Sequence, residues 1–180
     1  MFSIKHLGLA LAVVAPFLVA TPGAIAQNEG IALIGPEANA EEIRRSFRRS
    51  LAAPESTGRS LSAEPNEPPP VAFLVPFEFD SAVPTPEGAV LLAMIGAAIV
   101  GDVELAAMSY IVDGHTDSVG KAAYNEHLGQ RRADTVLGAL IQAGLPLSRL
   151  AARSFGETRG LPGLAPSDKR NRRVEITPFE

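Results

Sequence analysis

The chain has 180 residues, enough for one domain with short appended segments. It contains no cysteine, which excludes disulfides, zinc–thiolate sites, cysteine nucleophiles and lipid attachment through an N-terminal cysteine. Its formal net charge of −4 at pH 7 leaves no electrostatic reason to bind nucleic acid.

The segment 1–26 has the organisation of a Sec-type signal peptide. Lys5 supplies a basic start, the run 7–20 is apolar, and "AIA" ending at Ala26 fits a cleavage site of small residues. A membrane-spanning helix needs about 20 apolar residues, so this run is short for a retained anchor. We therefore expect export, cleavage after Ala26 and no transmembrane segment in the mature chain, with a retained anchor as the alternative.

The segment 37–52, "EANAEEIRRSFRRSLA", is predicted to be a short helix. Asn39 and Glu42 have the spacing of a capping box. Four arginines cover most of the surface, and one face is apolar, with Ile43, Phe47 and Leu51. Three apolar side chains are too few for a core, so the helix is predicted either to be solvated or to recruit an envelope partner or an anionic surface.

A proline-rich spacer is predicted after this helix. Five of the fifteen prolines fall within 53–70, a segment with too little apolar surface to fold. The expected organisation is therefore a signal peptide at 1–26, a short helix with a disordered spacer at 27–70, and one folded domain at 71–180.

The domain at 71–180 is predicted to be an α/β sandwich, with one mixed sheet and helices on one face. Helices are expected at 85–100, where Thr85 and Pro86 form a start signal, and at 121–144. Strands are expected in four segments: 71–80, 108–115, 148–156 and 172–179.

The helix at 85–100 is expected to be buried on most sides. From Ala89 to Val100 it is apolar apart from glycine, yet it is too short to span a bilayer. Such a helix needs cover from the sheet and, as an open alternative, from a second subunit in a homodimer.

The stretch "GHTDSVGKAAYNEHLGQRRA" (114–133) gathers polar side chains that suit either catalysis or binding. His115 and Asp117 would point to the same side of a strand, and with His127 they could form a zinc hydrolase site. No serine elbow, HExxH run or third well-spaced ligand accompanies them. A binding site is therefore favoured, with no catalytic residue, metal or cofactor; His115 is expected to pack inside and His127 to lie at the surface.

Asp117 and Arg132 are predicted to clamp a zwitterion. A carboxylate favours an ammonium group, and the N–H groups at a helix start favour a carboxylate. Asn125 and Arg132 are seven residues apart on one helix face, about 10 Å along the axis. Arginine grips a carboxylate with two hydrogen bonds, so these groups together complement the free end of an amino acid.

Four segments resemble the OmpA-like C-terminal domain, a peptidoglycan-binding module of Gram-negative envelopes. They are "FEFDSA", "GHTDSVGKAAYNEHLGQRRADTV", "SFGETR" and "NRRVEI", in the family's order, and the resemblance covers 71–180. It implies a βαβαβ-type fold that binds the diaminopimelate of the peptidoglycan stem peptide without covalent chemistry. It also implies a location in the periplasm, associated with the cell wall or the outer membrane.

The resemblance further implies the residues of the site. Asp117 would meet the ammonium of diaminopimelate and Arg132 its carboxylate. The supporting positions are Asn125, Arg172, Thr116 and Asp80. Three features depart from the family's pattern: Gly129 stands where serine is usual, Asp168 stands where arginine is common, and the helix at 85–100 is unusually apolar. Gly129 is expected to cost the helix about 1 kcal/mol relative to alanine.

Overall fold

The computed structural model describes residues 33–53 and 68–180. The predicted signal peptide and most of the predicted proline-rich spacer lie outside the described residues, so both stay predictions.

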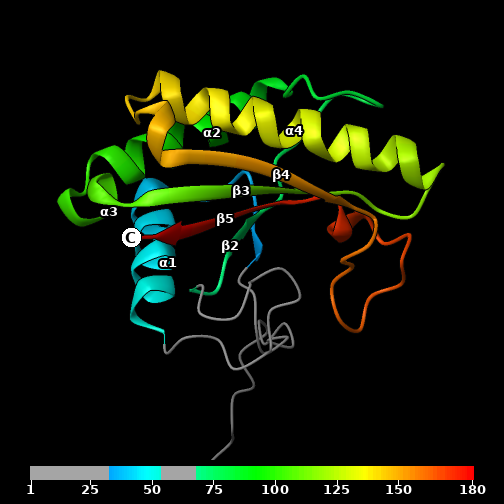
Figure 1. The fold of residues 1–180 in the computed structure, drawn as a ribbon, viewed down its shortest axis with the longest axis horizontal. Helices are drawn as coiled ribbons and strands as arrows, with labels where there is room; N and C mark the ends of the chain where they lie inside the picture. Colours follow the sequence, from blue (N-terminus) through cyan, green and yellow to red (C-terminus); the bar gives the residue numbers. More distant parts are fainter. Residues whose placement is uncertain (1–32, 54–67) are drawn as a thin grey trace, which may run out of the picture.

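A mixed sheet of five strands, in the order β1-β2-β5-β3-β4, forms one layer of the structure (Figure 1). β1 pairs with β2 and β3 with β4 in parallel, whereas β5 is antiparallel to both of its neighbours. The last strand of the chain therefore lies in the middle of the sheet. The strands are β1 (Leu33–Ile34), β2 (Val71–Phe73), β3 (Ser109–His115), β4 (Leu150–Gly156) and β5 (Val174–Phe179).

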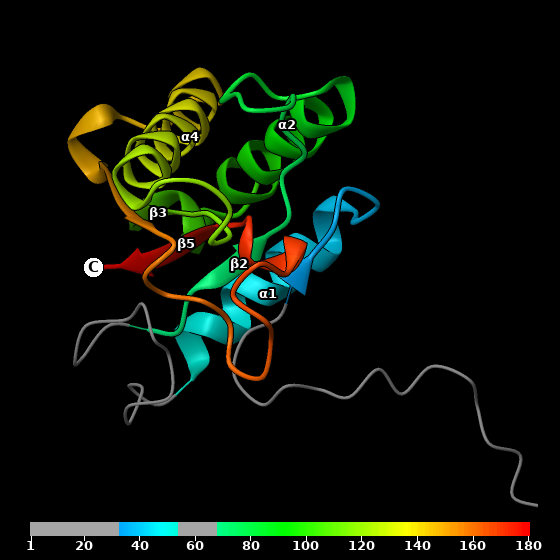
Figure 2. The same cartoon turned by 90° about the vertical axis from the view of Figure 1, so that its right-hand side faces the viewer.

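Helices form the second layer. The α-helices are α1 (Ala40–Ala52), α2 (Pro86–Val100), α3 (Val103–Ala107) and α4 (Ala122–Gln142), and the 3₁₀ turns are η1 (Leu147–Arg149) and η2 (Lys169–Asn171). α4 packs on β3 and β4, α1 contacts β2 and β5, and α2 contacts both of these helices. Figure 2 shows α4 and α2 side by side over the sheet. The predicted α/β architecture is confirmed.

Alternation along the central strands explains the core. Tyr110 and Val112 of β3 and Val174 and Ile176 of β5 are all buried and belong to one apolar cluster. The helices contribute the other half of this cluster through Leu91, Ile95, Ile99, Val136 and Leu140. Asp113 of β3 and Glu175 of β5 are charged yet buried, because their charges are paired inside the protein: Asp113 with Arg153 and Glu175 with Arg173.

α1 belongs to this core, which corrects the prediction of a helix outside the folded domain. Ile43 and Phe47 are fully buried, and the Phe47 ring lies 5.8 Å from the rings of both Phe73 and Tyr110. Its few apolar side chains cannot build a core alone, but they complete one that other elements have begun. The folded unit therefore includes 33–53 as well as the expected domain.

The arginines of α1 lie on its outer side. Arg48 is mostly exposed and pairs with the buried carboxylate of Asp102 at 2.7 Å. Asn39 caps the helix as predicted, since its Oδ1 accepts a hydrogen bond from the Glu42 N–H at 2.9 Å. Recruitment of a partner through this helix stays a prediction.

The predicted strand at 71–80 is too long. β2 ends at Phe73, and Pro76, which has no N–H to donate to a sheet, lies beyond it. Phe79 is 99% exposed, and Asp80 has a positive φ of 53°. The chain therefore leaves the sheet after Phe73 and turns at Asp80. The carbonyl of Ser81, which follows this turn, contacts Arg132 of the candidate site.

α2 begins as predicted, with the Thr85 hydroxyl accepting a hydrogen bond from Gly88 N–H at 3.2 Å. Its outer side carries Val90 and Val100, which are 57% and 42% exposed, so a homodimer that covers this helix stays a prediction. Across 33–53 and 68–180, no helix has both the length and the apolarity needed to cross a membrane.

Candidate functional site

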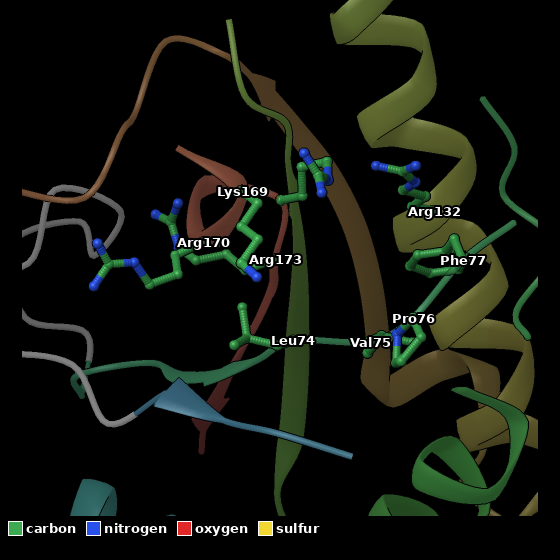
Figure 3. Close-up of a pocket in the computed structure, with 9 residues that line it drawn as sticks. Leu74, Val75, Pro76, Phe77, Arg132, Lys169, Arg170 and Arg173 are labelled. Atoms are coloured by element: carbon green, nitrogen blue, oxygen red, sulfur yellow. The ribbon is translucent and has the colours of Figure 1, made fainter. Parts of the chain in front are cut away.

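A cavity of about 330 Å³ lies between the end of β2, α4 and the turn before β5 (Figure 3). Residues 74–77 form its apolar edge. Its polar lining consists entirely of bases: Arg132, Lys169, Arg170, Arg172 and Arg173. Figure 3 shows Lys169, Arg170 and Arg173 on one side and Arg132 near Phe77 on the other. A cavity with these two kinds of lining suits a ligand with carboxylates and an aliphatic part.

α4 carries Arg132 into this cavity. The residue is only 7% exposed, and its guanidinium carbon lies 5.0 Å from the centre of the Phe77 ring. Its Nε donates a hydrogen bond to the Ser81 carbonyl at 3.0 Å. In the part of the chain that the structure describes, no carboxylate forms an ion pair with Arg132. Its terminal nitrogens are therefore available to an anionic ligand.

The charge of Arg132 is poorly compensated by the protein. Burial, followed by the nearby charge of Arg172, lowers the pKa of Arg132 from its ordinary value. The charges of Asp117 and Asp80 act in the opposite direction. A carboxylate brought by a ligand would supply the compensation that is missing.

The turn after β3 places Asp117 close to the same cavity. Asp117 is 7% exposed, and its Oδ1 accepts a hydrogen bond from the Val119 N–H at 3.2 Å. Its Oδ2 accepts a hydrogen bond from Nη1 of Arg172 at 2.5 Å. Arg172 lines the cavity, and both charges act on Arg132, so the three side chains share one neighbourhood.

Asn125 lies beside Asp117, and its side-chain amide forms hydrogen bonds within the protein. Its Nδ2 donates to the carbonyls of Asp117 and Val119, both at 3.2 Å, and to Oε2 of Glu157 at 2.6 Å. These bonds hold the turn after β3 in place. The structure therefore uses the amide to position Asp117.

Of the six predicted site residues, Arg132 and Arg172 line the cavity, whereas Asp117, Asn125, Thr116 and Asp80 lie outside its lining. Thr116 is buried, its N–H donates to the Gly156 carbonyl at 2.8 Å, and its hydroxyl has no hydrogen-bond partner among the described residues. Asp80 is exposed and accepts a hydrogen bond from the Tyr124 hydroxyl at 2.6 Å. Asp80 thus contributes charge from the rim rather than a contact inside the cavity.

The predicted zinc ligands do not come together. His115 is 1% exposed, its ring stacks on Phe155 with centroids 5.5 Å apart, and burial lowers its pKa. His127 is at the surface. Within 33–53 and 68–180, no group of three or more histidine, aspartate or glutamate side chains is arranged to hold a metal ion.

Sequence reasoning missed most of the basic lining of the cavity. The run "KRNRR" (169–173) was the available signal, but it reads equally well as solvated charge. Arg173 is in fact 3% exposed and pairs with Glu175 at 2.6 Å. The apolar edge at 74–77 was hidden inside the predicted strand.

The sequence profile of the OmpA family matches residues 76–173, just over half of the chain. The chain therefore belongs to the OmpA family, as the resemblance predicted. The domains of this family are not enzymes, which agrees with the prediction of a non-catalytic site.

Two curated relatives have outer-membrane names. Outer membrane porin F of Pseudomonas fluorescens is 47% identical over 68 residues, covering 37% of this chain and 21% of the relative. Outer membrane protein A of Escherichia fergusonii is 35% identical over 87 residues, covering 48% of this chain and 35% of the relative. The chain thus spans only 21% and 35% of these two relatives.

Solved structures show the same fold. The OmpA-like domain of FopA1 from Francisella tularensis has a TM-score of 0.50 and 27% identity, over 57% of this chain and 68% of that one. The periplasmic domain of Helicobacter pylori MotB has a TM-score of 0.52 and 21% identity, over 64% of this chain and 78% of that one. The second similarity concerns the fold alone.

Proposed function

We propose that this member of the OmpA family binds peptidoglycan non-covalently through the diaminopimelate of the stem peptide and thereby attaches to the cell wall. The observation that carries the proposal is the guanidinium of Arg132, which is buried, lacks a carboxylate partner among the described residues and lies near the Arg172–Asp117 ion pair. A guanidinium and a carboxylate in one neighbourhood complement the carboxylate and the ammonium group at the end of an amino acid.

In this mechanism Arg132 binds the carboxylate of the ligand with its terminal nitrogens, because the planar guanidinium matches a carboxylate at two points. Asp117 binds the ammonium. Its carboxylate has about four acceptor positions, so it can accept from the ligand beside its bonds to Val119 and Arg172. No bond of the ligand is made or broken.

The other predicted residues support this clamp. Asn125 holds the turn that carries Asp117, and Arg172 orients the Asp117 carboxylate. Thr116 brings a buried hydroxyl without a partner to the same turn, where it can bond to the ligand. Asp80 adds negative charge at the rim, on the side of Tyr124.

We also propose that the chain works in the periplasm of a Gram-negative bacterium, associated with the wall or the outer membrane. The signal-like segment 1–26 and the outer-membrane names of the relatives support this location. A peptidoglycan ligand requires such a compartment.

Co-sedimentation with purified sacculi tests the proposed function. Asp117→Asn and Arg132→Gln each remove one charge of the clamp and leave the corresponding charge of the ligand without its partner, so each should weaken binding by about 2–5 kcal/mol. Arg45→Gln, on the exposed side of α1, is the matched control and should sediment like the wild type. Wild-type sedimentation of both clamp variants would refute the mechanism.

A further inference from the structure

The cavity contains a second cation without an internal partner. Three of its five bases are held in ion pairs by the protein itself: Arg170 with Asp168, Arg172 with Asp117, and Arg173 with Glu175. Among the described residues, Lys169 and Arg132 have no such carboxylate. Among the described residues, the cavity therefore has two basic side chains that form no ion pair within the protein.

The local structure of η2 explains why Lys169 forms no ion pair with Asp168, the carboxylate next to it in the sequence. Asp168 accepts hydrogen bonds from the backbone N–H of Arg170 at 2.9 Å and from its guanidinium at 3.0 and 2.8 Å. This arrangement holds the Asp168 carboxylate on Arg170, so that Lys169 acts on Asp168 only through its charge and forms no close ion pair with it.

The two unpaired cations lie on different sides of the cavity. Figure 3 shows Lys169 on the side of Arg170 and Arg173, and Arg132 on the side of Phe77. Leu74, Val75 and Pro76 form the apolar edge between them. A peptide with two carboxylates joined by aliphatic carbon would match two cations on different sides of a cavity that also has an apolar edge.

We propose that Lys169 is a specificity-determining residue that binds a second carboxylate of the wall peptide, in addition to the carboxylate held by Arg132. The inference rests on the proposed function and adds selection for peptides whose carboxylates are free rather than amidated. Amidation replaces a charged acceptor by a neutral group, so it removes the attraction to Lys169. Because Lys169 is exposed, its ion pair is worth less than that of the buried Arg132.

Calorimetric titration with synthetic peptides tests this inference. The parent probe is the tripeptide L-alanyl-γ-D-glutamyl-meso-diaminopimelate, which has two carboxylates besides the one of the clamped zwitterion. Two further probes have one or the other of these carboxylates amidated. The wild type should bind one of the amides about twofold to fivefold more weakly than the parent, the range expected for an exposed ion pair.

The variant Lys169→Gln should bind the parent as weakly as the wild type binds that amide, and should no longer distinguish the two. Lys169→Arg should restore the preference. Arg132→Gln should lose all three peptides. Arg49→Gln, an exposed arginine in the last turn of α1, removes the same charge far from η2 and should behave like the wild type.

The outcomes separate the two proposals. The role of Lys169 is overturned if the wild type binds the parent and both amides equally well, or if Lys169→Gln keeps the wild-type preference. In either case the clamp of Asp117 and Arg132 still stands if Arg132→Gln loses binding. Failure of the wild type to bind either the parent peptide or sacculi overturns both. Thermal melting of each variant shows that it is folded, and the exposed position of Lys169 makes misfolding of its variants unexpected.

Discussion

Arg172 donates a hydrogen bond from Nη1 to Oδ2 of Asp117 at 2.5 Å, although 55 residues separate them in the chain. The pair couples the turn after β3 to the turn before β5. Asp117 is thereby oriented, but its negative charge is also partly neutralised before an ammonium group arrives. Arg172 thus both helps and opposes the binding of a cationic group.

Replacing Arg172 should therefore weaken peptidoglycan binding less than replacing Asp117. In Arg172→Gln the orientation of Asp117 is lost, but the repulsion between the guanidinium and the ligand ammonium disappears as well. Sacculus binding of Arg172→Gln is expected to lie between that of the wild type and that of Asp117→Asn. The double variant should bind like Asp117→Asn alone, because Arg172 acts through that carboxylate. Additive losses in the double variant would show an independent contact.

Close packing of α4 on β3 and β4 explains the glycine at position 129. A Cβ at Gly129 would lie 2.3 Å from Oγ of Ser154 and 3.1 Å from the Gly114 carbonyl oxygen. The Ser154 hydroxyl donates to the Glu126 carbonyl at 2.9 Å and occupies the space that a side chain at 129 would need. Glycine at position 129 therefore permits the close contact between α4 and Ser154 of β4, although it lowers the intrinsic stability of the helix.

Gly129→Ala should destabilise the protein, although alanine normally stabilises a helix by about 1 kcal/mol relative to glycine. Adding Ser154→Ala removes the clashing hydroxyl and should recover part of the loss. Gly138→Ala, on the same helix with open space around its Cβ position, should follow the ordinary helix preference. Urea unfolding gives the three free energies; stabilisation by Gly129→Ala alone would contradict the packing argument.

Phe47 is the residue through which α1 joins the core. Truncation of a fully buried phenylalanine leaves a cavity and typically costs 3–5 kcal/mol, so Phe47→Ala should lower the free energy of unfolding by about this amount. Arg49→Ala, on the exposed side of the same helix, should change it little. Urea unfolding measures both free energies, and their difference is reliable if the free energy of unfolding depends on urea concentration with the same slope in both variants. If Phe47→Ala hardly changes the free energy of unfolding, α1 does not contribute to the core and is an appended helix.

His115 should make the stability of the protein depend on pH below neutrality. Burial lowers its pKa in the folded protein, opposed mainly by Glu175. As the pH falls below about 6.5, the unfolded chain binds a proton on this histidine that the folded protein does not accept. The free energy of unfolding should therefore be unaffected by His115 above that pH. Below it, His115 should lower the free energy of unfolding by at most about 1.4 kcal/mol per pH unit.

Urea unfolding at several pH values between 7.5 and 5 measures this effect. The charged groups that act on His115 are Glu175, Arg173 and Asp113, and they remain in the variant His115→Phe. The difference in slope between the wild type and His115→Phe therefore isolates the histidine. The exposed His127→Gln should keep the wild-type slope. Identical slopes for the wild type and His115→Phe would rule out the histidine as the cause.

Local patterns were sufficient for most helices and strands. The cap formed by Thr85 and the capping residue Asn39 both function as their spacing predicts. Such signals act over a few residues, so they survive without knowledge of the fold. The strand at 71–80 was predicted too long because alternation continues past the point at which Pro76 and the turn at Asp80 take the chain out of the sheet.

By itself, the sequence determined the family, the layered architecture and the residue types available for a clamp, because these depend on motifs and on periodicity along the chain. Only the tertiary structure decided which of those charges are used inside the protein. Asn125 donates to the turn after β3 and to Glu157, Arg173 pairs with Glu175, and Arg132 forms no ion pair with a carboxylate among the described residues. These outcomes depend on which distant segments meet, and the energy of a charge depends on its partner and its burial rather than on its neighbours in sequence.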